Sequence, residues 1–202
     1  AYVVTDEVYE HIVYAPYKHI YMQSLEGMRE RTIVCNSLSK TYSITGWRLG
    51  YVIANPQIID RVKKVHDFLT VGAAAPLMEA AVVGLEFGDG YYDELAAHYA
   101  HMKEVFVGGL KKLGLKYTDP QGAYYVLVDV SEFGVKDDVK FCEWMAQFVG
   151  VAAVPGSSFF REDVHNLVRF HFAKQDDTLN EAIKRLATLK EKAMNAKNVD
   201  WR

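Results

Sequence analysis

Short apolar runs separated by polar segments dominate the first part of the chain. Residues 2–5 form one such run, and residues 32–35 and 49–54 form two more on either side of a polar loop. Apolar runs of this length, bounded by turn-forming residues, are typical of buried strands. We therefore expect three strands here. Residues 10–31 mix aromatic residues, histidines, charges and a proline without a sustained period, which predicts a loop with short local turns.

Two helices are expected next. Asn55-Pro56 supplies a capping residue and a proline in the first turn, and the apolar positions that follow have helical spacing: Ile58, Ile59, Val62, Val65 and Leu69. Residues 76–87 are apolar almost all round, so this second helix should be well buried. Gly88-Asp89-Gly90 interrupts the pattern and predicts a boundary between a domain of residues 1–89 and one of residues 90–202.

Helical and extended patterns alternate at close spacing after this boundary. Helices are expected at residues 91–113, ending at Gly114, at residues 137–148, and after residues 178–181, which have capping-box spacing; strands are expected at residues 123–130, 151–154 and 167–172. Such an order predicts an α+β layer with helices over a small sheet. The residues from about 193 onward resemble a tail.

Composition narrows the class of protein. The chain has 202 residues, half of them hydrophobic, and a net charge of −3, which does not favour nucleic acid or an anionic membrane as a partner. No apolar stretch approaches the roughly 18 residues of a transmembrane helix, and no signal-peptide pattern is present. Cys35 lies in an expected strand and Cys142 in an expected helix, so both should stay reduced and buried in a cytoplasmic protein.

The start of the chain is abrupt. Ala1 stands in place of an initiator methionine, and residues 2–5 enter a strand without a cap, turn or tail. We therefore expect the sequence to be a fragment of a longer protein.

Reactive side chains gather where the expected strands end. Lys40 lies in a hydroxyl-rich loop with Ser37 and Ser39, and Arg48 follows eight residues later, while Asp6 follows the first strand. Ligands in open α/β sheets collect beyond the carboxyl ends of strands, which makes these residues candidates for a site. Two simpler alternatives stay open: Lys40 can be a solvated surface charge, and Asp6 can cap the following turn.

A metal site is not indicated by the sequence. His98 and His101 are three residues apart on an expected helix, but neither an HExxH pattern nor a carboxylate at a suitable offset accompanies them. Gly88-Asp89-Gly90 likewise lacks the spacing and the preceding strand of a phosphate-binding fingerprint.

Pyridoxal phosphate is the cofactor whose chemistry needs this set of groups. Lys40 can form a Schiff base with its aldehyde, and Asp6 can hold its ring nitrogen protonated through a charge-assisted hydrogen bond. Tyr9 can donate to the phenolate oxygen of the ring. Ser37 and Arg48 can hold the phosphate, for which the planar fork of arginine is well suited.

The sequence resembles a known family in several segments. These are residues 6–9 (DEVY), 37–40 (SLSK), 45–50 (TGWRLG), 121–125 (QGAYY), 155–159 (PGSSF) and 168–173 (VRFHFA). In this order they resemble the fold-type I pyridoxal-phosphate enzymes, and within them the class I/II aminotransferases of the kynurenine, aromatic, methionine and aspartate branch. The resemblance covers almost the whole chain but only the second half of the family's length.

This resemblance implies an α/β fold: the C-terminal part of a large, three-layer α/β/α cofactor domain, followed by an α+β small domain. It implies that Lys40 carries the cofactor and then moves a proton between the substrate α-carbon and the cofactor. It also implies that Arg169 pairs with the substrate α-carboxylate, although an arginine in an exposed strand is by itself more typical of a surface ion pair. The implied activity moves an amino group between an L-amino acid and a 2-oxo acid in a homodimer.

The chain departs from the family pattern in two ways. Phe160 follows Phe159 where relatives usually have glycine. In addition, the glycine-containing phosphate loop, the aromatic residue over the ring and the asparagine beside the ring oxygen belong to the absent first half. Two alternatives therefore remain: a carbon–sulfur β-lyase of the same fold, and a non-catalytic fragment or binding domain. The sequence does not identify the amino acid and 2-oxo acid.

Overall fold

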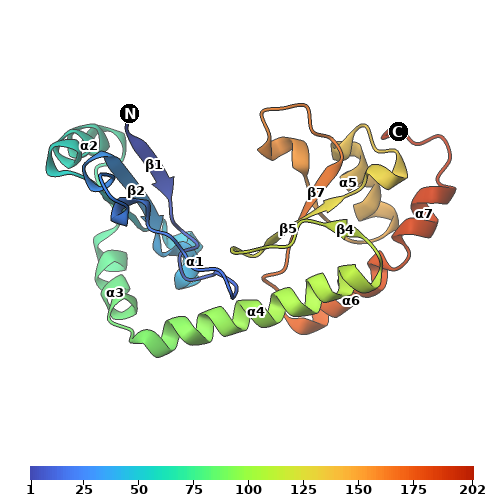
Figure 1. Ribbon diagram of the computed structural model, residues 1–202, viewed down its shortest axis with the longest axis horizontal. Coiled ribbons are helices and arrows are strands. Elements are labelled where there is room, and N and C mark those ends of the chain that lie inside the picture. The colour runs from blue at the N-terminus through green and yellow to red at the C-terminus, as the bar shows by residue number, and fades with distance from the viewer. The chain divides into compact units, whose positions relative to one another are not determined.

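A computed structural model describes residues 1–202, which form two compact units, Ala1–Ala96 and Ala97–Arg202. The units divide inside a single long helix, α4 (Asp89–Lys112), visible in Figure 1. Of the segment expected to interrupt the helices, Gly88 lies between α3 and α4, whereas Asp89 and Gly90 are the first residues of α4. That the flanking regions are a large and a small domain stays a prediction.

Unit 1 contains a three-stranded sheet in the order β1-β2-β3. Strand β1 (Val3–Asp6) runs parallel to β2 (Thr32–Ser37), and β3 (Gly50–Ile53) runs antiparallel to β2. Only two short 3-10 turns, η1 (Met22–Ser24) and η2 (Arg29–Arg31), interrupt the connection from β1 to β2. The three strands and the loop with local turns are therefore confirmed.

The lysine segment is more regular than the sequence predicts. Lys40 lies in a single helical turn, α1 (Leu38–Thr41), and a 3-10 turn, η3 (Thr45–Trp47), follows. The expectation of a loop at Lys40 was wrong because Ser37 acts as an N-cap: its Oγ accepts the backbone N–H of Ser39.

Helices α2 (Pro56–Leu69) and α3 (Ala75–Leu85) complete unit 1 together with the first turns of α4. The Asn55 cap is confirmed, since its side chain accepts from the N–H of Gln57. The expected burial of the second helix was wrong: Ala81 is the buried residue of α3, and α2 has none. The physical reason is that nothing in this chain covers the outer sides of these helices.

Unit 2 contains a four-stranded antiparallel sheet in the order β4-β5-β7-β6. Its elements after α4 are β4 (Lys116–Tyr117), β5 (Tyr125–Asp129), η4 (Ser131–Phe133), α5 (Asp138–Phe148), β6 (Val154–Pro155), η5 (Gly156–Phe159), β7 (Leu167–His171), α6 (Asp176–Leu186) and α7 (Leu189–Asn195). Alternation along β5 and β7 buries one face of the sheet, where Phe170 meets Phe106 of α4 at a ring-centroid distance of 5.8 Å. Tyr125, Leu127 and Arg169 lie on the other face.

Four expectations for unit 2 were wrong in detail. The strand expected at residues 151–154 is β6, which begins only at Val154. Thr178 lies inside α6, which begins at Asp176 after Gln175, so the capping box does not form. Phe148 is 52% exposed instead of contributing to the buried face of α5. The final residues are not a tail, because Trp201 is fully buried and its ring packs edge-on against Phe141 at 5.1 Å. The indole adds apolar contacts that hold the C-terminal segment against α5.

None of the helices has the length and the apolar character needed to cross a membrane.

Candidate active site

The ends of β1 and β2 bring Asp6 and Ser37 to the same edge of the sheet. Because the two strands are parallel, with Asp6 beside Cys35, their carboxyl ends coincide. The Asp6 carboxylate is exposed, and its Oδ1 accepts the N–H of Val8 at 3.2 Å. Asp6 thus makes the local turn bond expected of a capping residue and still has acceptor capacity for a ligand.

The hydroxyl of Ser37 organises the turn that carries Lys40. Its Oγ lies 3.1 Å from the N–H of Ser39, 2.7 Å from Ser39 Oγ and 3.0 Å from the Leu49 carbonyl oxygen. These contacts tie the start of α1 to the residue preceding β3. Lys40 is half-buried, whereas Ser39 and Thr41 beside it are buried. The amine is therefore held on a short, well-anchored turn.

Arg48 occupies an unusual backbone conformation. Its φ is +57°, in the left-handed region that costs a non-glycine residue on the order of 1 kcal/mol. The exposed guanidinium donates to the Thr45 carbonyl at 2.9 Å. Two residues later the backbone approaches β2 closely, since a Cβ on Gly50 would lie 2.6 Å from the Asn36 carbonyl oxygen. Only glycine permits this close approach, which holds the backbone that follows Arg48 against β2.

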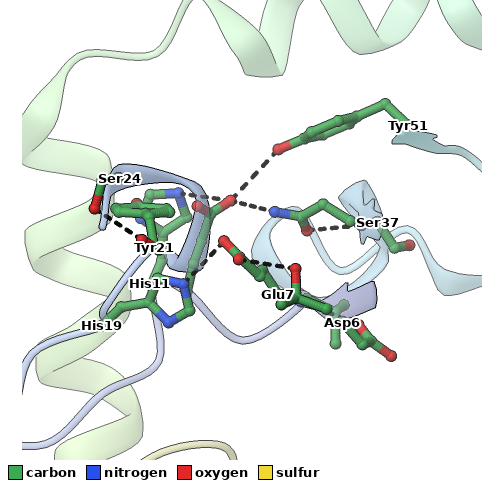
Figure 2. A network of polar contacts seen from close by, with 12 residues as sticks. Asp6, Glu7, His11, His19, Tyr21, Ser24, Ser37 and Tyr51 are labelled. Atoms are coloured by element: carbon green, nitrogen blue, oxygen red, sulfur yellow. Dashed lines mark hydrogen bonds and ion pairs between the residues drawn. The ribbon is translucent and has the colours of Figure 1, made fainter. Parts of the chain in front are cut away.

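Tyr9 lies on a turn between Glu7 and Glu10, two carboxylates whose positions are fixed by hydrogen bonds. Glu7 is only 4% exposed and accepts from Thr5 Oγ1 at 3.0 Å, with His19 Nε2 at 3.1 Å from its other oxygen. In Figure 2 the Asp6 carboxylate points away from this cluster. Tyr9 itself is half-buried.

The second carboxylate, Glu10, links this turn to the lysine segment. It accepts from Asn36 Nδ2 at 2.6 Å, and the Tyr51 hydroxyl lies 3.5 Å away. Asn36 Oδ1 in turn accepts the backbone N–H of Ser37 at 2.7 Å. A continuous hydrogen-bonded path therefore connects the turn bearing Tyr9 with the N-cap of α1. Sequence reasoning missed it, although the acidic residues around Tyr9 were the available signal.

Burial and the charge of Glu10 shift the pKa values of the tyrosine and histidine side chains around it. Burial, followed by the hydrogen bond to Glu10, raises the pKa of Tyr21 to about 12. The pKa of Tyr51 is raised by burial and then by Glu10. Burial lowers the pKa of His11, with Glu10 opposing this shift and His19 adding to it. Both phenols consequently stay protonated at neutral pH and can act as donors.

Aromatic residues secure the other end of α1. The Tyr91 hydroxyl donates to the Thr41 carbonyl at 2.7 Å, and the hydroxyls of Tyr42 and Tyr92 are 2.9 Å apart. Burial, and then the hydrogen bond to Tyr92, raises the pKa of Tyr42. The rings of Tyr42 and Tyr91 stack with centroids 5.8 Å apart. The turn bearing Lys40 is thus anchored at both ends within unit 1.

Arg169 in unit 2 is held by aromatic rings. Its guanidinium carbon lies 4.1 Å from the ring centroid of Tyr125 and 3.6 Å from that of Phe159. The Nε is buried without a hydrogen-bond partner. Two cavities of about 390 and 310 Å³ are both lined by Arg169 and Tyr125. A cation stacked between rings, with a buried donor left over, is suited to receive a planar anion such as a carboxylate.

The two histidines weighed as metal ligands have other contacts. His101 Nε2 lies 2.8 Å from an oxygen of Asp176, and the ring of His98 packs against that of Tyr99. The chain has no group of three or more histidine, cysteine or acidic side chains placed to hold a metal ion.

Comparison with known proteins places the chain in a family. The model of "Aminotransferase class I and II" matches residues 1–186. The chain belongs to this family. The family resemblance seen in the sequence and the α/β fold class are therefore confirmed. Aminotransferases of class I and II generally use pyridoxal phosphate.

Individual aminotransferases are similar over nearly the whole chain. Methionine aminotransferase of Escherichia coli is 36% identical over 189 residues, which cover 93% of this chain and 49% of the relative. Aspartate aminotransferase of Pyrococcus horikoshii is 34% identical over 92% of this chain and 47% of the relative. The structure of N-succinyldiaminopimelate aminotransferase from Mycobacterium tuberculosis has a TM-score of 0.88 and 35% identity, covering 93% of this chain and 50% of that one. The chain thus spans about half the length of the aminotransferases it matches.

The residues at the strand ends fit pyridoxal phosphate. Asp6 is an exposed carboxylate, Arg48 an exposed guanidinium, and Lys40 a half-buried amine between them in the sequence. Ser37 retains a hydroxyl whose single proton can turn from one acceptor to another. This donor set supplies an anion for a ring nitrogen, an amine for an aldehyde and donors for a phosphate, which are the groups that the cofactor needs.

Proposed function

We propose that the whole protein is an aminotransferase that moves an amino group between an L-amino acid and a 2-oxo acid. The observation that carries this proposal is the position of Lys40. Its turn is anchored between the ends of β2 and β3, beside the strand end that carries Asp6, in a chain that belongs to the class I and II aminotransferases. A solvated surface lysine would not need this anchoring.

Four residues would hold the cofactor. Asp6 would accept a hydrogen bond from the ring nitrogen, and Tyr9 would donate to the ring oxygen. Ser37 and Arg48 would hold the phosphate through hydroxyl and guanidinium donors. When bound, pyridoxal phosphate supplies an electron-withdrawing ring that stabilises negative charge on the substrate α-carbon.

Lys40 would act as both the attachment point and the proton carrier. Its Nζ would take the proton from the substrate α-carbon and deliver it to the carbon of the cofactor that is joined to the substrate nitrogen. Anchoring of α1 by Ser37 at one end and by the bond from Tyr91 to the Thr41 carbonyl at the other limits the movement of the amine. Such restriction favours repeated proton transfer along one path.

Arg169 would bind the α-carboxylate of both substrates. Its stacked guanidinium offers a planar pair of donors, and the buried Nε gains a partner when a carboxylate arrives. A charge-assisted pair in this setting fixes the orientation of the substrate α-carbon.

A further segment of the protein would cover unit 1. Its exposed apolar side chains include Tyr2, Val4, Val65, Phe68, Leu69, Val71, Val83 and Leu85. Exposed apolar surface of this extent marks an interface. We propose that residues 1–89 are the C-terminal part of a large cofactor-binding domain and residues 90–202 a small domain. The remaining half of the enzyme would then cover the apolar residues of the large domain, and two such subunits would form a homodimer.

We also propose a cytoplasmic location. Cys35 and Cys142 are both free thiols. The expectation that both are buried was wrong for Cys35, which is half-buried, whereas burial raises the pKa of Cys142 to about 12. A buried, protonated thiol is unreactive and suits a reducing compartment.

Borohydride reduction of the whole enzyme with pyridoxal phosphate tests the site. We expect peptide mass spectrometry to find the cofactor fixed on Lys40. An adduct on another lysine, or none, would refute the assignment. The reaction is tested with 2-oxoglutarate and L-methionine, L-aspartate or L-kynurenine as donors, beside an assay for pyruvate release from cystathionine. Pyruvate release without amino transfer would identify a β-lyase instead.

A further inference from the structure

Asp138 is a fully buried carboxylate that the proposed reaction does not use. It is the first residue of α5 and is 0% exposed. One of its oxygens accepts the backbone N–H of Ser157 at 2.8 Å, and the other lies 2.9 Å from His165 Nδ1. Burial alone would raise the pKa of Asp138, but the bonds from Ser157 and His165 outweigh it and lower the pKa. The side chain is therefore an anion at neutral pH.

His165 connects this buried carboxylate to an exposed one. Its Nε2 lies 2.8 Å from Asp163 Oδ1, so each ring nitrogen faces a carboxylate. An ionised carboxylate only accepts hydrogen bonds, so the ring can satisfy both partners only as a doubly protonated cation. The bonds to Asp138 and then to Asp163 accordingly raise the pKa of His165.

The residue that Asp138 holds belongs to the same short turn as a residue that stacks on Arg169. Ser157 and Phe159 are both in η5, a four-residue 3-10 turn. The residue before Ser157 is pressed against β7, because a Cβ on Gly156 would lie 2.4 Å from the Leu167 carbonyl oxygen. The start of the turn is thus held both by α5 and by β7.

We infer that Asp138 and His165 form a clasp that positions Phe159 over Arg169 and so sets how well the enzyme holds a substrate carboxylate. This inference rests on the proposed function of Arg169. Within the clasp, Asp138 and His165 are positioning residues that act through Phe159 and do not touch the substrate. Without the clasp, η5 loses its hydrogen bond to α5, and the ring of Phe159 is free to leave the guanidinium.

The clasp also predicts a direction for the pH dependence of substrate binding. Since the pKa of His165 is raised, both ring nitrogens donate to carboxylates below the ordinary histidine pKa, and the clasp weakens as the pH rises through the raised value, because the neutral ring can donate to only one of them. Two other titratable groups, Asp138 and Asp163, act on His165, and Cys142 interacts electrostatically with Asp138. Asp138 stays ionised, and the Cys142 thiol, with a pKa of about 12, stays neutral over this range. His165 is therefore the group whose proton sets the strength of the clasp.

Kinetics of the whole enzyme with its best L-amino acid donor test this inference. We expect Asp138→Asn to raise KM, and the inhibition constant of acetate, about tenfold while kcat changes little, because one hydrogen bond of a buried group is lost. Acetate carries a carboxylate without an amine and therefore reports on Arg169 alone. His165→Gln, which keeps a donor but does not titrate, should abolish the rise of KM with pH. Asp163→Asn, at an exposed position, is the matched control and should leave KM near that of the wild type below the ordinary histidine pKa.

A double-mutant cycle and hydrogen exchange separate positioning from general loss of structure. If Asp138 acts through Phe159, then Asp138→Asn adds little to the KM of Phe159→Ala. The amide of Ser157 should exchange faster in Asp138→Asn, whereas the amides of β7 keep their protection. Additive effects on KM, or unchanged acetate binding in Asp138→Asn, would overturn the clasp in an active wild-type enzyme. A wild-type enzyme without amino transfer would instead contradict the proposed function, and the inference with it.

Discussion

The two units differ in how far they bury their own hydrophobic residues. In unit 2, Leu110, Phe141, Met145 and Trp201 are all 0% exposed. In unit 1, Phe68 is 91% exposed, and a small cluster around Leu38, Leu49 and Ala81 supports the lysine turn. Unit 2 thus has a core of its own, whereas the unit that carries Lys40 leaves much of its apolar surface uncovered.

The unit that contains the candidate lysine is therefore not the unit that buries a hydrophobic core of its own. Unit 1 holds Lys40 through local hydrogen bonds, such as that from the Ser39 N–H to Ser37, and through the path from Glu10 to Asn36. These bonds define geometry, but each contributes only about 1 kcal/mol of net stability. The burial of large side chains in unit 2 contributes more per residue. Under the proposed function, the site would therefore depend on apolar cover supplied by the rest of the enzyme.

The largest expected effect comes from removing the reactive amine in unit 1. Lys40→Ala should lower amino transfer by the whole enzyme about 10⁴-fold, because both covalent attachment and proton transfer are lost. The rate of 2-oxo acid formation measures this. Lys64→Ala, an exposed lysine on α2, is the control and should retain full activity. Comparable losses in both variants would mean that the chemistry does not lie on α1.

A matched pair of phenylalanines tests the difference in core between the units. In this chain, Phe141→Ala should lower the free energy of unfolding by about 3–5 kcal/mol, since it empties a fully buried site. Phe68→Ala should change it by less than about 0.5 kcal/mol, because its ring is exposed. Urea denaturation followed by circular dichroism gives both values. Equal destabilisation by the two variants would contradict the contrast between the units.

Arg169 is the residue of unit 2 that is proposed to bind the substrate carboxylate. Arg169→Lys should lower kcat/KM about 100-fold, because an ammonium cannot make the bidentate pair with a carboxylate. The same variant should still accept the cofactor on Lys40, which borohydride reduction would show. Arg185→Lys, which alters an arginine that donates to Glu181 and to the Gly150 carbonyl, serves as the control. If both arginine variants kept their kcat/KM, unit 2 would have no part in substrate binding.

The smallest expected effect concerns a surface pair of unit 2. The hydrogen bond to Asp176, and then its charge, raises the pKa of His101. A raised pKa gives stability that is present below the ordinary histidine pKa and is lost as the pH rises through the raised value. His101→Gln should therefore lower the thermal midpoint slightly at pH 5.5 and not at pH 8.5. A larger loss at the higher pH would reverse the assigned sign.

Much of the site could be predicted because its residues lie at strand ends. Asp6 and Ser37 follow two apolar runs, and parallel strands bring such ends to one edge. The network around Tyr9 could not be predicted, since Glu7 and His19 are twelve residues apart and Glu10 and Asn36 twenty-six. No local pattern indicates which polar side chains will meet across such separations.

The errors in predicted burial have a related cause. Helix α3 is apolar enough for a core, yet only Ala81 is buried, because a hydrophobic pattern shows that a surface needs cover and not what covers it. The opposite error occurred at the C-terminus, where the sequence resembles a tail but Trp201 is fully buried. In both places the outcome depends on contacts from distant parts of the chain or from beyond it.

By itself, the sequence predicted most of the strands and helices and the family, and it supplied the candidate residues Lys40, Asp6, Tyr9, Ser37, Arg48 and Arg169; it missed β4. These follow from local hydrogen bonding, side-chain periodicity and motif order, which act over a few residues. Only the tertiary structure decided that Arg169 stacks between Tyr125 and Phe159, that Asp138 meets Ser157 and His165, and that unit 1 lacks cover. The physical reason is that packing and buried polar contacts join residues far apart in the chain, and their energies depend on which surfaces finally meet.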